Sequence, residues 1–200
     1  MPPKREQDRP GLRERKKART RASIQSHALR LFQRQGYEAT TIEQIIDAAE
    51  VSESTLFRYF ATKEDLVLQD DNDPIVIATF RRNLEQVPPI TAIRATFREF
   101  FDSLTARQRA EQRQRITLIL SVPSIRARLL DQLFDATRQL ADAIARHEQR
   151  PADDLAVRAT AGAIIGTLLG VLSAIADDPD AELDELVDQA LAHLEAHLAT

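Results

Sequence analysis

The stretch TTIEQIIDAAEVSESTLFRYFATK, residues 40–63, constrains the fold more than any other part of the chain. Its apolar residues follow the three-to-four spacing of a buried helical face in two successive runs. The first run is Ile42, Ile45, Ile46 and Ala49, and the second is Val51, Leu56 and Phe60. Two amphipathic helices this short cannot bury much apolar surface alone. The sequence therefore predicts that they pack against a third helix, which we place at residues 23–35.

A connection of three residues, Glu50 to Ser52, separates the two short helices. Ser52 can cap the second helix because a serine hydroxyl accepts a hydrogen bond from an otherwise unpaired amide of the first turn. Thr41 can cap the first helix in the same way. Two short helices joined by such a turn predict a helix-turn-helix, whose second helix enters the major groove of DNA.

This stretch and the KEDL that closes it resemble the DNA-binding signature of the tetracycline-repressor (TetR/AcrR) family of bacterial transcriptional regulators. The resemblance covers about residues 20–68 and rests on the leading threonines, the paired alanines, the valine-serine turn and the aromatic residues from Phe57 to Phe60. Glu50 departs from the pattern, because the family usually has glycine there. Glycine adopts a positive φ without strain, so Glu50 either bears a conformational cost or keeps ordinary helical geometry.

The resemblance also implies which residues touch DNA. Positions matching Ser54, Arg58 and Tyr59 face bases or the adjacent backbone, and those matching Thr41, Tyr59 and Lys63 hold phosphates. An arginine such as Arg58 can donate two hydrogen bonds to guanine, although an ordinary solvated arginine is the alternative interpretation. The predicted DNA-binding residues are Thr41, Ser52, Ser54, Thr55, Phe57, Arg58, Tyr59 and Lys63.

Charge is distributed unevenly along the chain. Residues 1–34 carry eleven Lys or Arg and three Asp or Glu, a net charge of +8, whereas residues 71–200 carry a net −6. A basic end ahead of a helix-turn-helix indicates contact with DNA phosphates and an affinity that falls with salt. The alternative is a solvated tail, and we predict disorder for residues 1–11, which contain three prolines and a glycine.

The remaining sequence predicts an all-α fold, because only five glycines occur among 200 residues and no alternating strand pattern is present. We expect a three-helix helix-turn-helix domain at residues 12–70, followed by a larger helical bundle at residues 71–200 that binds a ligand and dimerises. The sequence QDDNDP marks the boundary. Further helices are expected from residue 62 and at residues 74–86, 91–107, 110–121, 124–147, 153–176 and 183–198.

A concentration of aromatic residues in the larger domain indicates either plain core packing or an effector pocket, which the family places in this region. The sequence from residue 115 to 130 weakly resembles family members that bind acyl-CoA-like ligands. This implies a lipophilic effector with an anionic head, for which Arg94, Arg98 or Arg115 could be partners. The predicted pocket residues are Phe97, Phe101, Arg98, Arg115 and Phe134.

Three glycines spaced four apart, Gly162, Gly166 and Gly170, predict a shallow groove that lets another helix approach closely. In the resembled family the last two helices pair with their symmetry mates in a four-helix bundle. We therefore predict a homodimer interface that includes these glycines with Leu183 and Leu191. The alternative is that the glycines serve packing within one chain.

Other classes of function receive little support from the sequence. The chain has no cysteine, which excludes disulfides and thiolate metal sites, and it has no phosphate-binding loop or nucleophile elbow. His193 and His197 are spaced like a metal pair, but no third ligand is identifiable, so we predict neither a metal nor a cofactor nor enzymatic activity. The N-terminus lacks a secretory signal, which favours a cytoplasmic protein without membrane attachment.

The sequence thus predicts a dimeric repressor that binds a palindromic operator in double-stranded DNA and is released by a small lipophilic effector. The helix that begins at Thr62 is the expected lever between the two domains. Two alternatives remain: a DNA-binding protein without ligand control, and a membrane-associated helical protein that uses the uncharged residues 159–176.

Overall fold

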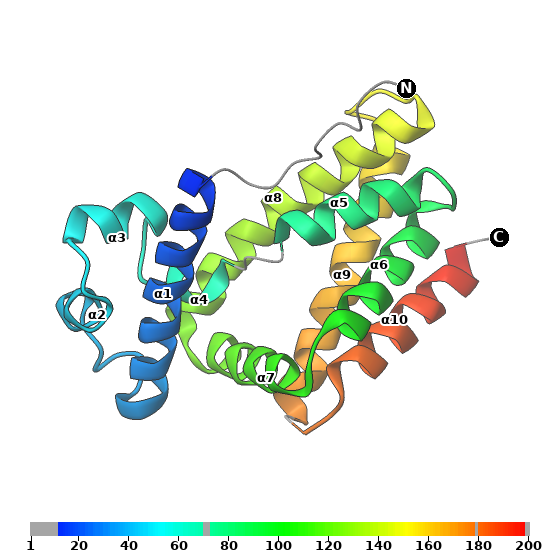
Figure 1. Ribbon diagram of the computed structural model, residues 1–200. Coiled ribbons are helices and arrows are strands. Elements are labelled where there is room, and N and C mark those ends of the chain that lie inside the picture. Colours follow the sequence, from blue (N-terminus) through cyan, green and yellow to red (C-terminus); the bar gives the residue numbers. More distant parts are fainter. Residues whose placement is uncertain (1–11, 70–72, 179, 199–200) are drawn as a thin grey trace, which may run out of the picture. The chain divides into compact units, whose positions relative to one another are not determined.

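The computed structural model describes residues 12–69, 73–178 and 180–198, and within these ranges it contains ten α-helices and no strand (Figure 1). The all-α fold class expected from the sequence is confirmed. The helices are α1 Leu12–Gln35, α2 Ile42–Ala49, α3 Glu53–Tyr59, α4 Asp65–Leu68, α5 Asp73–Leu84, α6 Pro89–Ser103, α7 Ala106–Ser121, α8 Pro123–Glu148, α9 Leu155–Asp177 and α10 Leu183–Leu198.

The chain divides into two compact units, Met1–Val67 and Leu68–Thr200. The division falls inside α4, three residues before the boundary that the sequence predicts after residue 70. Residues 70–72 lie outside the described residues, as does the tail at residues 1–11 for which disorder is predicted.

Helix ends in the first unit follow the local sequence closely. The side chain of Thr41 accepts a hydrogen bond from the amide of Gln44, whose own side chain caps the amide of Thr41, so α2 begins with a capping box. Gly36 ends α1 with a φ of 86°. Glu50 occupies the left-handed region with φ 53° and ψ 45°, and thus bears the conformational cost that a glycine would avoid, about 1 kcal/mol.

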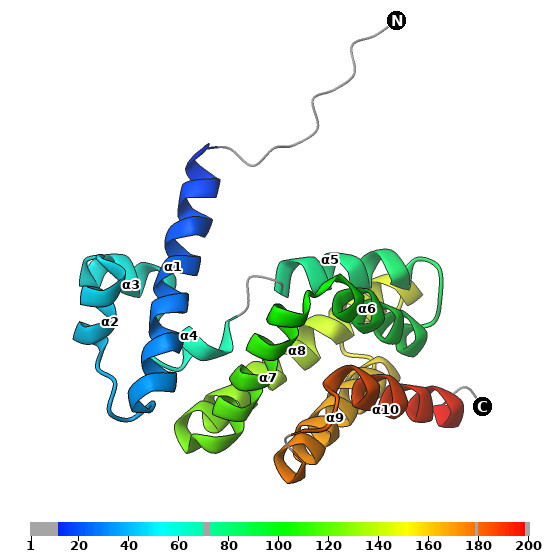
Figure 2. The ribbon, with the colours of Figure 1, turned by 60° about the horizontal axis from the view of Figure 1, so that its bottom comes forward.

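The core of the first unit joins α1 to the two short helices. α2 and α3 lie beside α1, with Ile24, Ala28 and Phe32 of α1 buried (Figures 1 and 2). Ile45 and Leu56 are also fully buried, one from each short helix. The apolar spacing in residues 40–63 therefore predicted both the helices and the faces that they bury.

The second unit has its core among α5, α6, α8, α9 and α10. The most deeply buried members, from four of these helices, are Ala92, Ile144, Ala161, Ile164 and Leu191. The boundaries predicted for α6, residues 91 and 107, are wrong at both ends. Pro89 occupies the first turn of α6, where its missing N–H costs nothing, and Thr105 caps α7 and so ends α6 early.

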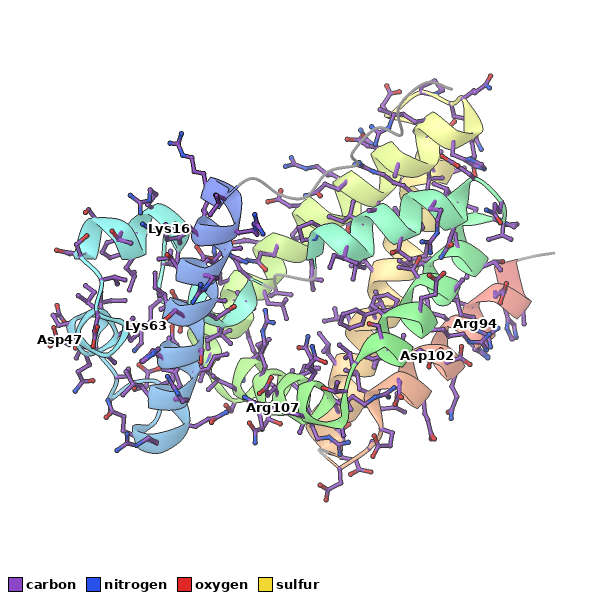
Figure 3. All side chains as sticks on the ribbon, in the orientation of Figure 1. Lys16, Asp47, Lys63, Arg94, Asp102 and Arg107 are labelled. Carbon is purple, nitrogen blue, oxygen red and sulfur yellow. The ribbon has the colours of Figure 1, made fainter. Side chains whose placement is uncertain are left out.

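Charged side chains fasten α10 to α6. Arg94 of α6, labelled in Figure 3, donates to both carboxylate oxygens of Asp188 at 2.8 and 3.0 Å and to Glu195 at 3.0 Å. Arg98 donates to the same Asp188 carboxylate at 2.6 Å. The hydrogen bonds from Arg94 and then Arg98 hold the pKa of the Asp188 carboxyl well below its usual range. Both arginines are thus committed to ion pairs within the chain.

Candidate nucleic-acid interface and effector cavity

Helix α3 presents one polar edge to solvent and buries the other. Leu56 within the helix and Phe60 at its end are fully buried, whereas Ser54 and Arg58 are exposed. Phe57 has 44% of its surface exposed although it is a large apolar side chain. The exposed edge of α3 therefore offers a hydroxyl, a guanidinium and an aromatic ring to a partner.

Three of the predicted DNA-binding hydroxyls have structural roles in the free chain. Ser52 accepts a hydrogen bond from the amide of Thr55 at 3.2 Å and donates to the Thr55 hydroxyl at 2.9 Å. Thr41 caps α2. These hydroxyls form hydrogen bonds at the starts of the two helices and so help to fix where α2 and α3 begin.

Lys63 is held against its own unit. Its ammonium donates to the carbonyl of Tyr37 at 2.5 Å and lies 4.1 Å from the centre of the Tyr37 ring (Figure 3). Partial burial lowers the pKa of the Lys63 ammonium, while Glu38 and Glu64 oppose this effect. An ammonium has three donors, so this contact leaves two N–H groups of Lys63 for another acceptor.

A basic groove lies between the start of α1 and the end of α3. It has a volume of about 570 Å³ and is lined by Arg13, Lys16, Lys17, Thr20, Arg58 and Tyr59. Lys16 leaves α1 on the side of α3 (Figure 3). The guanidinium of Arg58 lies 5.2 Å from the centre of the Tyr59 ring, which limits where it can swing. The groove thus connects the basic segment at the start of α1 with helix α3.

An apolar cavity of the second unit has a volume of about 520 Å³. Its walls come from the end of α4 and from α5, α6, α8 and α9. The buried lining residues are Leu68, Phe80, Ile93, Leu140, Ala143 and Ile164. The volume falls within the range of about 300–1,000 Å³ typical of small-molecule sites.

The structure separates the residues that the sequence assigned to one effector pocket. Phe97 lines the apolar cavity. Arg115 donates at 2.8 Å to the carbonyl of Leu68, a lining residue, without lining the cavity itself. Phe134 is 75% exposed and does not line it, so this prediction is wrong. One position separates Phe134 from the lining residue Leu133, and one position rotates a side chain by about 100° around a helix.

Arg98 and Phe101 lie in a second, smaller pocket of about 280 Å³ between α6 and α10. Arg94 and Phe97 also line it, with the four carboxylates of Asp102, Asp184, Glu185 and Asp188. Because acids outnumber the two arginines and Asp188 already binds both, this pocket repels an anionic group. The assignment of Arg94 or Arg98 to an anionic head group is therefore wrong.

The glycines of α9 occupy the face that points away from the core of their own chain. A Cβ built at Gly162, Gly166 or Gly170 meets no atom within 4 Å, whereas Val157, Ala161 and Ile164 of the same helix are buried. Packing within one chain therefore does not account for the glycines. Leu191 is fully buried in its own core, so its assignment to a dimer interface is wrong, and Leu183 packs against the same core.

Helix α9 is the one helix among the described residues that is long and apolar enough to cross a membrane. Its buried residues Val157, Ala161, Ile164 and Val171 belong to the core of the second unit. The ring centres of His193 and His197 lie 4.1 Å apart on α10, with the rings tilted by 37°, and the described residues contain no group of three potential metal ligands. Glu195, between them, binds Thr91 and Arg94.

An exposed helix edge after a capped turn, with a basic groove beside it, defines a helix-turn-helix DNA-binding protein. Residues 24–69 match the family of bacterial regulatory proteins called the tetR family, and residues 87–199 match the MftR C-terminal domain. The HTH-type transcriptional regulator TcmR of Streptomyces glaucescens is 34% identical over 152 residues, 72% of this chain and 67% of that protein. The chain belongs to the TetR family and is a DNA-binding transcriptional regulator.

Solved structures share this fold. SmeT of Stenotrophomonas maltophilia, in complex with triclosan, has a TM-score of 0.62 and 20% identity, covering 90% of this chain and 91% of that one. FadR of Thermus thermophilus, in complex with lauroyl-CoA, has a TM-score of 0.52 and 22% identity, covering 87% of this chain and 92% of that one. Triclosan and lauroyl-CoA differ widely in charge and size, so they do not define the effector of this chain.

Proposed function

We propose that the protein is a dimeric repressor that binds a palindromic operator and dissociates from it when a small lipophilic effector binds. The observation that carries this proposal is that the chain pairs an exposed reading edge on α3 with an apolar cavity of about 520 Å³ in its second unit. A cytoplasmic location, without membrane attachment and without catalytic activity, follows from this role.

The contacts to DNA divide by chemistry. Ser54, Arg58 and the Phe57 ring are placed to meet base edges, because they share the solvent edge of α3. Arg13, Lys16 and Lys17 of the basic groove, together with Lys63 and the hydroxyl of Tyr59, are suited to phosphates. The hydroxyls of Thr41, Ser52 and Thr55 act mainly by fixing the helix ends.

A second copy of the chain completes the operator-binding unit, since one reading helix meets too few bases to select a site. The exposed glycine face of α9 is the surface that we assign to this contact. Beside it runs a groove between α9 and α10, lined by Gly170, Ala174, Ala190 and Leu194 among others. The apolar outer face of α9 thus receives a partner helix.

Helix α4 is the element through which an effector would act. Within the first unit, Gln25 of α1 donates to the carbonyl of Leu66 at 3.1 Å. Within the second unit, Arg115 of α7 donates to the carbonyl of Leu68, whose side chain lines the cavity. A ligand that moves Leu68 therefore pulls on α4, and by linkage it must weaken DNA binding by the factor by which DNA weakens ligand binding.

The division between base and phosphate contacts is testable with DNA from upstream of the coding region of the protein and a scrambled duplex. Replacing Arg58 with alanine should weaken specific binding by about 1–3 kcal/mol and leave nonspecific binding largely intact. Replacing Lys16 with alanine should weaken binding to both duplexes and lower the salt slope by about 1. Fluorescence anisotropy at several salt concentrations measures both effects.

Arg107→Ala serves as the control, because Arg107 is an exposed arginine of the second unit that pairs with Glu111 at 2.8 Å. This variant should bind both duplexes as the parent protein does. Equal losses on the two duplexes for Arg58→Ala would show that Arg58 does not read bases.

A further inference from the structure

Most of the polar residues that line the apolar cavity lie on one helix, α8. On α8 the lining residues Gln132, Asp135 and Gln139 follow a helical stripe next to the apolar stripe that includes Leu133 and Leu140. Gln69 and Arg81 are the other lining residues with polar side chains. Arg81, Asp135 and Gln139 are exposed, so the polar stripe marks the mouth of the cavity and the apolar residues form its floor.

The lining residues at this mouth include one of each charge. Arg81 is the one cation among the lining residues, and Asp135 is the one anion. Asp135 is also engaged from outside the cavity by Arg138 at 2.7 Å. The floor, formed by Phe80, Ile93 and Ile164, holds no charged group at all.

An anionic ligand would lose solvation in such a cavity without adequate compensation. A carboxylate or sulfonate carried inward finds no cation at the floor, and the one lining arginine, Arg81, is exposed at the mouth, where solvent screens its charge. Glutamine amides, by contrast, donate and accept hydrogen bonds with uncharged groups. Gln132 and Gln139 at the mouth can therefore hold hydroxyl, carbonyl or amine groups of a neutral ligand.

We infer that the effector is an uncharged amphipathic molecule, with its apolar part on the floor near Ile164 and its neutral hydrogen-bonding groups at the glutamine mouth. This inference rests on the proposed effector control. It would separate the protein from regulators that bind anionic lipophilic ligands, because the floor of the cavity holds no cation.

Two fluorescent probes with one aromatic framework test the inference on the full-length protein. N-Phenyl-1-naphthylamine is uncharged, and 1-anilinonaphthalene-8-sulfonate adds a sulfonate. Titration should show the uncharged probe binding the cavity at least about tenfold more tightly. Signal is assigned to the cavity only if it disappears in Ala143→Leu and in Ala136→Leu, which fill it from two places. Ala127→Leu, exposed on α8 outside the cavity, is the matched control.

A change of charge at the mouth of the cavity is the second test of the inference. Asp135→Lys should tighten sulfonate binding about tenfold, whereas Asp131→Lys, exposed on the same helix but outside the lining, should leave it unchanged. Cavity binding of the sulfonate or of lauroyl-CoA that equals or exceeds that of the uncharged probe would overturn the inference and leave effector control standing. If no probe binds the cavity, effector control and the inference fall together.

Discussion

Replacing Gly166 with arginine should leave the protomer folded and convert the proposed dimer to a monomer. A side chain at this position meets nothing within 4 Å in its own chain, and arginine has a helix propensity about 1 kcal/mol better than glycine. In the proposed dimer the same side chain would bury a charge where two helices approach closely. A monomer contacts only one half-site, so operator binding should weaken about 100-fold or more, because two α3 helices no longer bind the same DNA together.

Light scattering after size-exclusion chromatography measures the first effect, and DNA titration measures the second. Ala110→Arg on the exposed surface of α7 is the control and should remain a dimer. A dimer that persists in Gly166→Arg would show that the glycine face is not the interface. If Gly166→Arg does not fold, the glycines serve packing within one chain instead.

Replacing Phe60 with alanine should lower the free energy of unfolding of the first unit by about 3–5 kcal/mol. Phe60 is fully buried at the end of α3, and the guanidinium of Arg21 lies 5.4 Å from the centre of its ring. The loss is comparable to a large part of the total stability of a small domain, about 5–15 kcal/mol. Specific DNA binding should disappear with the folded unit. Hydrogen exchange of the amides in residues 12–67 reports the unfolding directly.

Phe57→Ala is the matched control, because it removes the same ring from the same helix at a position that is 44% exposed. It should lower the free energy of unfolding by less than about 1 kcal/mol, as expected for a largely solvated side chain. Similar protection from exchange in Phe57→Ala and Phe60→Ala would show that α3 is not oriented by its buried aromatic residue.

The helix-turn-helix was predictable from sequence because its signals are local. Thr41 and Ser52 cap helices through amides within three residues of themselves, and the spacing of Ile45 and Leu56 reflects one buried face. The conformation of Glu50 was left open, since a glutamate gives no sign that its backbone is left-handed. The turn holds Glu50 in the left-handed conformation, because the backbone amide of Glu50 donates a hydrogen bond to the carbonyl of Asp47.

The apolar cavity of the second unit was less predictable because it depends on how long helices rotate against one another. On α8 two apolar stripes lie side by side, and only packing decides that Leu133 lines the cavity while Phe134 faces outward. The sequence suggested Arg94 and Arg98 as partners of an anionic ligand group. In the structure both arginines bind Asp188 of α10, which lies ninety positions or more along the chain. The acidic character of α10 was the available signal, and it favours internal ion pairs.

Selection from a pool of random duplexes tests the central claim most directly. Full-length protein should enrich one sequence arranged as an inverted repeat, with half-sites about one helical turn apart on the same face of the DNA. Arg58→Ala, carried through the same selection, should lose preference at the base pairs nearest α3. A pool in which no sequence is enriched would contradict the account, because the exposed edge of α3 would then bind DNA without reading it.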